Sequence, residues 1–165
     1  DISHTISLLT DGDGTTAHYY VFYRSGASTW LWEKLAMPYR WTAAGYIQYD
    51  LAGTMTQGQL GRYYNTYLLQ TNLSGEAGFA IIHGRGEFTT LALAQAENFG
   101  DFTYAGLGIA EFVAAWQFTW ATSNAYRTKG KCRLAAPPKH LDVSVVTTPP
   151  RWSHVASGPS NGNLE

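Results

Sequence analysis

The chain consists largely of short runs of β-branched, aromatic and alternating apolar residues that are bounded by turn residues. Runs of this length and composition are typical of β-strands. About eight such strands with short connections predict a single antiparallel β-barrel, with a β-sandwich or jelly roll as the alternative. Closure favours the barrel because it removes exposed sheet edges. We predict strands at residues 4–10, 17–24, 39–56, 62–71, 79–90, 101–120, 121–134 and 141–146.

Two segments carry helical signals. Residues 28–37 have a partly apolar face, with Ser28 as a predicted N-cap and Pro38 after the last turn, which predicts a short helix. Residues 101–120 fit two periods: Ile109, Phe112, Val113 and Trp116 have helical spacing, whereas Phe112, Trp116, Phe118 and Trp120 alternate as in a strand. The neighbouring glycines favour the strand. The connection over residues 90–99 has weak helical character.

The composition divides the chain into two regions. Residues 1–134 form the predicted β-barrel domain, and residues 135–165 form a Pro-rich extension with one short strand and a mobile tail. Hydrophobic residues make up 45% of the chain, which excludes a disordered protein. Charged residues make up only 14%, below the roughly 25% of an average soluble domain.

Charge and cysteine content limit the partners that we expect. The net charge is −1 and no nucleic-acid motif is present, so we expect no nucleic-acid partner. The alternating basic residues Arg127, Lys129, Lys131 and Arg133 read as a charged edge strand, with a phosphate site as the alternative. No apolar run is long enough to span a membrane. Cys132 is the only cysteine, and no metal-ligand spacing occurs, so we expect neither a disulfide nor a metal site.

The first residue is Asp1, so either a targeting segment has been removed or the chain is trimmed. The compartment therefore stays open between cytoplasmic and exported.

The most informative stretch for chemistry is Phe79–Thr90. A strand sends alternate side chains to one face, so His83, Arg85 and Glu87 would lie side by side, with neighbours roughly 6–7 Å apart. If these groups face an apolar lumen, Arg85 holds Glu87 ionised and His83 acts as an acid or base near neutral pH. The alternative is a structural ion-pair ladder on the outer face.

Other residues complete the predicted site. Glu111 is a further candidate catalytic carboxyl, because burial between Ile109 and Val113 would raise its pKa, and an exposed Glu on a helix face is the alternative. Asp50, among Tyr46, Tyr49 and Leu51, is the other candidate. Several strands mix aromatic and polar groups on one face, as the wall of a ligand-holding lumen does. The predicted substrate-binding residues are His18, Tyr20, Tyr46, Tyr64, Phe112 and Trp116.

Two stretches resemble the late strands of the barrel family that includes allene oxide cyclases and dirigent proteins. They are His83-Gly-Arg-Gly-Glu-Phe-Thr and Gly100-Asp-Phe-Thr-Tyr-Ala-Gly-Leu-Gly-Ile-Ala-Glu-Phe. The resemblance implies an eight-stranded barrel that shapes a reactive small molecule for ring closure or coupling. It carries over no specific catalytic residue. The segment from Trp30 to Trp41 and the Pro-rich C-terminus depart from that family's pattern.

Together these observations predict a protein that binds a hydrophobic small molecule in a barrel lumen and acts as a cofactor-free cyclase or isomerase. Aromatic walls would hold the substrate in a near-attack shape while one or two polar groups polarise it. A non-catalytic, lipocalin-like carrier is the first alternative. A structural or recognition module, such as a coat or carbohydrate-binding domain, is the second. The many aromatics and few charges predict a homo-oligomer under each hypothesis.

Overall fold

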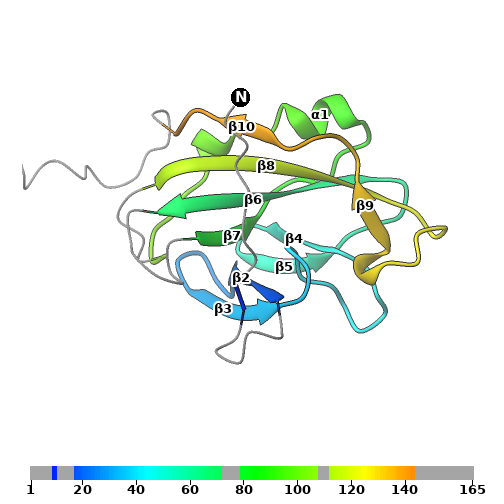
Figure 1. The fold of residues 1–165 in the computed structure, drawn as a ribbon, viewed down its shortest axis with the longest axis horizontal. Coiled ribbons are helices and arrows are strands. Elements are labelled where there is room, and N and C mark those ends of the chain that lie inside the picture. The colour runs from blue at the N-terminus through cyan, green and yellow to red at the C-terminus, as the bar shows by residue number, and fades with distance from the viewer. Residues whose placement is uncertain (1–8, 11–16, 72–78, 108–111, 144–165) are drawn as a thin grey trace, which may run out of the picture.

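The computed structural model of the chain describes residues 9–10, 17–71, 79–107 and 112–143. It is mainly β, with one eight-stranded sheet and a separate two-stranded hairpin (Figure 1). The strands of the large sheet are β1 Leu9–Thr10, β2 Ala17–Arg24, β3 Trp30–Leu35, β6 Tyr63–Thr71, β7 Phe79–His83, β8 Phe112–Thr122, β9 Cys132–Leu134 and β10 Lys139–Leu141. The hairpin is β4 Gln48–Leu51 and β5 Thr54–Gln57. One short α-helix, α1 Leu91–Gln95, and single turns at Phe99–Asp101 and Lys129–Lys131 complete the described elements.

The main sheet runs in the order β3-β2-β7-β6-β8, and β9 and β10 both pair with β8 beyond it. The pairing of β2 with β7 is parallel, and the other described pairings are antiparallel. Among the described strands, no pairing joins β3 to β9 or β10, so the sheet is open in Figure 1. The predicted β-rich class is confirmed. The predicted closed barrel is not confirmed, and the sheet is mixed because β7 lies parallel to β2.

Strict alternation along β6 and β8 gives the sheet two distinct faces. We call one the helix face, because α1 and the segment up to Leu107 cover it. Tyr67, Leu69, Ile82 and Ala115 project there and pack against Phe99, Phe102 and Tyr104. The rings lie 5.0–6.5 Å apart in tilted and edge-on pairs, which are favourable geometries for aromatic packing.

We call the opposite side the loop face, because the connection between β3 and β4 packs on it. Val21, Leu68 and Ile81 form its centre. Tyr39 and Ile47 from the connection pack beside them against Tyr64 and Trp120. Neighbours in sequence, such as Leu68 and Leu69, therefore enter different cores.

The predicted helix at residues 28–37 is wrong. The segment forms β3 instead, because all six residues from Trp30 to Leu35 pair with β2. The side chains then divide by period two: Trp30 packs with the helix-face core, and Leu35 packs with the loop-face core. The Trp30 indole also donates to the carbonyl of Ala105 at 3.0 Å. Tertiary pairing here outweighs the weak local helical pattern.

The predicted strand over residues 79–90 is too long, because β7 ends at His83. Gly84 leaves the sheet where the backbone passes close to other groups. Its N–H donates to the carbonyl of Asn65, and its own carbonyl accepts from the N–H of Asp50. A Cβ built on Gly84 would lie 2.5 Å from the Glu97 carboxylate. Glycine at this position lets the chain pass close to Asn65 and Glu97, because an added Cβ would force these groups to shift.

The predicted bent strand over residues 39–56 is a connection followed by the β4–β5 hairpin. Its turn residues Ala52 and Gly53 both have positive φ, 52° and 93°, as the tight two-residue turn of a hairpin requires. In the region 101–120, the strand interpretation is confirmed only from Phe112 onward. The predicted arm over residues 121–134 contributes only the end of β8 and the short strand β9. Of the predicted strand 141–146, residues 144–146 lie outside the described residues.

Within the described ranges, no helix is long and apolar enough to cross a bilayer.

Candidate functional site: an apolar groove on the sheet

A groove of about 340 Å³ opens on the loop face of the sheet. Its floor comes from four adjacent strands, β2, β7, β6 and β8, and its sides come from the β3–β4 connection and β9. We call this cavity the apolar groove. Its lining residues are Tyr19, Ala36, Met37, Pro38, Leu68, Ile81, Phe118, Trp120 and Leu134.

Strand register explains why these side chains meet. Leu68 of β6 is the direct partner of Ile81 in β7, so the two project side by side. Phe118 and Trp120 lie two residues apart in β8 and therefore share this face. Their rings stack with centroids 6.3 Å apart and only 10° between planes. The floor is consequently a continuous apolar surface.

The wall formed by the β3–β4 connection is held at several points. The Tyr39 hydroxyl donates to the carbonyl of Lys129 at 2.7 Å, and the Tyr39 ring packs edge-on against Trp120 at 4.9 Å. The N–H of Arg40 donates to Nε2 of His83 at 2.9 Å. These bonds fix the segment that carries Met37 and Pro38, so the groove is largely preformed.

No charged side chain lines the apolar groove. Burial raises the pKa of the Tyr19 phenol, so this group stays neutral at physiological pH and can donate a hydrogen bond. The Trp120 indole N–H is already bonded to the Thr66 hydroxyl at 2.8 Å. Leu134 is 40% exposed at the rim. The groove thus offers an uncharged, mostly apolar surface with one phenol hydroxyl among its lining residues.

The predicted grouping of His83, Arg85 and Glu87 on one strand face is wrong, because β7 ends at His83. His83 is buried, and burial, followed by the charge of Arg40, lowers its pKa to about 3. The imidazole is therefore neutral near pH 7 and accepts a bond from the Arg40 backbone. It holds the β3–β4 connection in place, and its pKa is too low for the predicted acid–base role near neutral pH.

Arg85 is directed to the helix face, away from Glu87. Its guanidinium lies 4.6 Å from the centre of the Phe102 ring and donates to the carbonyl of Thr103 at 2.7 Å. The carboxylate that Arg85 does contact is Glu97, through a backbone N–H bond of 2.7 Å. Arg85 therefore stabilises the loop that covers the helix face.

Glu97 is a half-buried residue that no sequence pattern indicated. It accepts hydrogen bonds from the Tyr67 hydroxyl at 2.6 Å and from Asn65 at 2.8 Å. Burial raises its pKa, and these hydrogen bonds offset part of that effect. No local pattern could have revealed it, because it follows α1 in an irregular segment.

Glu87 lies beside a different predicted residue, Tyr64. The Tyr64 hydroxyl donates to the Glu87 carboxylate in a short hydrogen bond, and Arg62 is 3.9 Å from the same carboxylate. Burial, followed by the bond to Glu87, raises the pKa of Tyr64. Of the predicted catalytic and substrate-binding residues, this pair is brought together in direct contact.

Asp50 has a structural environment. Both of its carboxylate oxygens accept from the buried guanidinium of Arg24, at 2.6 and 2.9 Å, and one also accepts from the N–H of Gly53 at 2.8 Å. This pair ties the hairpin turn to the end of β2. Bidentate pairing satisfies the charge of a carboxylate that would otherwise be costly to bury.

The remaining predicted residues are dispersed, and none of them lines the apolar groove. Tyr46 lies under Lys131, Tyr20 packs with Trp32, and Trp116 packs against His140. His18 and Phe112 belong to β2 and β8, and Glu111 lies outside the described residues. The alternation of Trp116, Phe118 and Trp120 was the one sequence signal that could have identified part of the groove.

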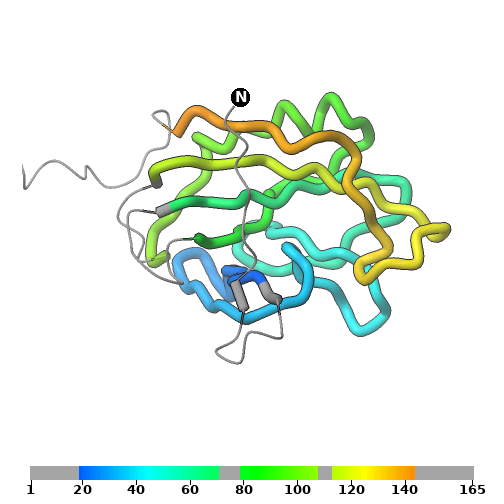
Figure 2. Tube along the Cα trace, in the orientation of Figure 1, coloured from blue at the N-terminus to red at the C-terminus, as the bar shows by residue number. Residues whose placement is uncertain are grey.

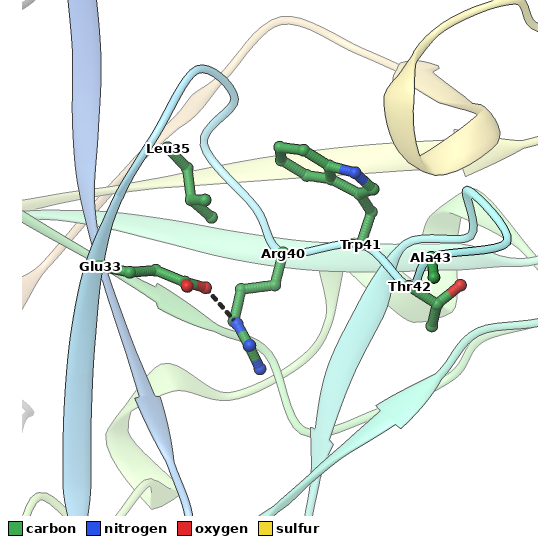
Figure 3. Close-up of a pocket in the computed structure, with 6 residues that line it drawn as sticks. All are labelled: Glu33, Leu35, Arg40, Trp41, Thr42 and Ala43. Carbon is green, nitrogen blue, oxygen red and sulfur yellow. Dashed lines mark hydrogen bonds and ion pairs between the residues drawn. The ribbon is translucent and has the colours of Figure 1, made fainter.

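A second hollow, of about 260 Å³, lies beside the same connection and is shown in Figure 3. Glu33 and Arg40 pair within it, and Trp41 projects above them (Figure 3). The Arg40 guanidinium also covers the Tyr23 ring at 3.8 Å. Its charged groups already satisfy one another, so this hollow is a weaker candidate for ligand binding than the apolar groove.

Among the described residues, no three His, Cys, Asp or Glu side chains are grouped so that they could hold a metal ion. Comparison with known proteins supplies no family for the chain: no family model, curated protein or solved structure matches it.

Proposed function

We propose that this protein binds a small, predominantly apolar molecule in the apolar groove on the loop face. The observation that carries the proposal is the lining itself, in which nine side chains from six segments meet without a charge. Ligand sites are typically concave, mostly apolar and equipped with a few polar groups that fix orientation. The Tyr19 phenol is the polar group here.

The size of the groove sets the class of ligand. Small-molecule pockets usually span about 300–1,000 Å³. A volume of about 340 Å³ lies at the lower end of that range. A compact aromatic or short aliphatic compound fits, whereas a long lipid chain would extend past Leu134 into solvent. A hydroxyl or carbonyl on the ligand would meet the Tyr19 hydroxyl.

The energetics favour occupation. Each Å² of apolar surface removed from water contributes about 25 cal/mol. Leu134, at the rim, remains 40% exposed, so a ligand that covers it removes apolar surface from water. Because hydrogen bonds and ring packing fix the β3–β4 connection, little ordering is required on binding.

A fluorescence titration tests this function. N-phenylnaphthylamine is a neutral probe whose emission rises in apolar surroundings, and we expect saturable binding with one site per chain. Ala36→Trp places an indole at the rim of the groove and should weaken binding at least about tenfold, which corresponds to about 1.4 kcal/mol. Ala44→Trp is the matched control, since Ala44 is exposed in the same connection but does not line the groove. Equal binding by both variants would place the probe elsewhere.

Turnover of the bound molecule, as cofactor-free cyclisation or isomerisation, is the second candidate function. The contact between Tyr64 and Glu87 favours it, because a carboxylate can act as a general base and the phenol that donates to it fixes its orientation. Tyr64 is also the direct cross-strand partner of Trp120, which lines the groove. Isomerisation leaves mass unchanged, so the test compares chromatographic retention of a ligand recovered from the protein. If the wild type converts the ligand and Glu87→Gln does not, catalysis is supported. If neither protein converts the ligand, binding without turnover is the function that remains.

A further inference from the structure

Nearly half of the basic residues of the chain lie in one short stretch of the sequence. Residues 123–139 contain five of the eleven Lys and Arg residues and no Asp or Glu. The neighbouring segment 38–49 also lacks carboxylates, and its one cation, Arg40, is already paired with Glu33. The net charge of −1 does not reveal this uneven distribution, and it led to the expectation that the chain has no nucleic-acid partner. Figure 2 shows residues 123–131, in yellow, projecting at one end of the sheet.

Three cations of this stretch each lie over an aromatic ring. The ammonium of Lys129 lies 5.0 Å from the centre of the Trp41 ring, and that of Lys131 lies 4.1 Å from the centre of the Tyr46 ring. The third pair is Arg133 and Tyr126, with the guanidinium carbon 4.4 Å from the ring centre. Lys129 and Arg133 are exposed, and the three rings are half-buried. We call these six residues the cation–aromatic surface.

The backbone that carries the cation–aromatic surface is firmly held. The carbonyl of Gly130 accepts from the N–H of Ile47 at 3.0 Å, and the carbonyl of Lys129 accepts from the Tyr39 hydroxyl at 2.7 Å. Lys131 has a φ of 48°, a left-handed conformation that a non-glycine residue adopts only where its surroundings impose it. The backbone that carries the cations is therefore held in place, and Lys129 and Lys131 lie over rings from the distant segment 38–49, which reduces the ordering required on binding.

We propose that the cation–aromatic surface binds single-stranded nucleic acid without sequence preference. Cations along a groove or ridge neutralise phosphates, and interleaved rings stack on unpaired bases. Lys129, Lys131 and Arg133 would contact the backbone, while Trp41, Tyr46 and Tyr126 would lie against bases. A duplex would use the cations alone, because its bases are already stacked. The rings therefore favour a single strand over other polyanions.

Fluorescence anisotropy with a labelled oligothymidylate of about twelve nucleotides tests the proposal. Binding should weaken as salt rises, with a slope of log K against log salt of about −2 if three phosphates are neutralised, since each contributes about −0.7. The double variant Lys129→Glu with Arg133→Glu should lose at least about tenfold in affinity. Lys34→Glu is the matched control, because Lys34 also lies over a tyrosine ring, 5.5 Å from the centre of Tyr20, but on β3.

The stacking contribution needs its own variant. Tyr126→Ala should weaken oligothymidylate binding about fivefold to a hundredfold and leave binding of inorganic polyphosphate, which has no bases, unchanged. Thermal unfolding confirms that each variant folds. If the double Glu variant does not fold, the variant Lys129→Gln with Arg133→Gln replaces it. The proposal is overturned if oligothymidylate does not bind or if the double variant binds as tightly as Lys34→Glu. It is also overturned if Tyr126→Ala has no effect and polyphosphate binds equally well, since the surface would then be a general polyanion site.

Discussion

Trp120 donates its indole N–H to the Thr66 hydroxyl at 2.8 Å, and this bond leaves the apolar part of the ring as a wall of the groove. Both residues are buried on the loop face, Thr66 in β6 and Trp120 in β8. A buried indole without an acceptor would need water inside the groove. The hydroxyl of Thr66 therefore satisfies the indole N–H within the protein.

Thr66→Val removes that acceptor with little change in shape. We expect a loss of about 1–3 kcal/mol in the free energy of unfolding, because a buried donor is left unsatisfied. For a chain of this size each kcal/mol lowers the melting temperature by about 2–4 °C, which calorimetry measures. Thr56→Val is the control, since the Thr56 hydroxyl bonds to the nearby carbonyl of Thr54 at 3.2 Å in a more exposed position. Equal losses of unfolding free energy in both variants would show that the Thr66 hydrogen bond contributes no more to stability than the Thr56 bond does.

Asp50→Asn breaks the buried pair with Arg24 and leaves the guanidinium uncompensated. We expect about 3–5 kcal/mol of destabilisation in urea unfolding at neutral pH. The double variant Arg24→Met with Asp50→Leu should regain much of that loss, because no buried charge remains. Arg62→Met removes the more exposed 3.9 Å pair with Glu87 and should cost less than about 1 kcal/mol. A much smaller loss of unfolding free energy in Asp50→Asn would mean that water reaches the Arg24 guanidinium.

Gly84→Ala tests why β7 ends where it does. The added Cβ would lie 2.5 Å from a Glu97 oxygen and 3.1 Å from the carbonyl oxygen of Asn65, so the loop must move. Overpacking of this kind costs about 1–3 kcal/mol. Gly26→Ala is the matched control, because its Cβ would meet Thr29 only at 3.6 Å. A neutral Gly84→Ala variant would show that the loop after His83 is not tightly packed.

His83 makes the native state sensitive to acid. Burial lowers its pKa from 6.5 to about 3, so the unfolded chain takes up this proton first. Stability is therefore lost as the pH falls from about 6.5 toward 3. Glu97 acts in the opposite direction: its raised pKa contributes stability at low pH that is lost as the pH rises through the folded-state value.

His83→Gln should flatten the acid side of the profile while its side chain can still accept the bond from Arg40. Urea unfolding at several pH values between about 4 and 7 measures the slope. His140→Gln, which removes an exposed histidine on β10, should follow the wild type. If the acid slopes of wild type and His83→Gln coincide, the imidazole is not the group that confers the sensitivity.

Much of the strand content could be predicted, because the alternation of residue types along the sequence matches the two faces of the folded sheet. The predicted strand 17–24 matches β2, and the predicted strand 62–71 differs from β6 by one residue. The strand interpretation of Trp116, Phe118 and Trp120 was also confirmed. In each case the two faces bury different side chains, so the period of two is strong.

The failures have physical reasons. In β3, Leu31 and Trp32 are exposed, so the apolar residues of this segment do not all lie on one buried face. The pairing of the segment with β2 therefore determines its structure. The parallel β2–β7 pair joins strands distant in sequence, and no local signal specifies it. The groove was missed because Met37 and Pro38 lie in an irregular connection whose position depends on bonds to distant residues such as His83.

The central claim is that an apolar ligand occupies the groove on the loop face. Methyl-resolved NMR during titration with N-phenylnaphthylamine tests it most directly. We predict saturable shifts for the methyl groups of Leu68 and Ile81, which line the groove. The methyl groups of Leu69 and Ile82, their direct sequence neighbours, lie in the helix-face core and should not shift. No shift at Leu68 and Ile81, or equal shifts at Leu69 and Ile82, would contradict the assignment of the groove as the binding site.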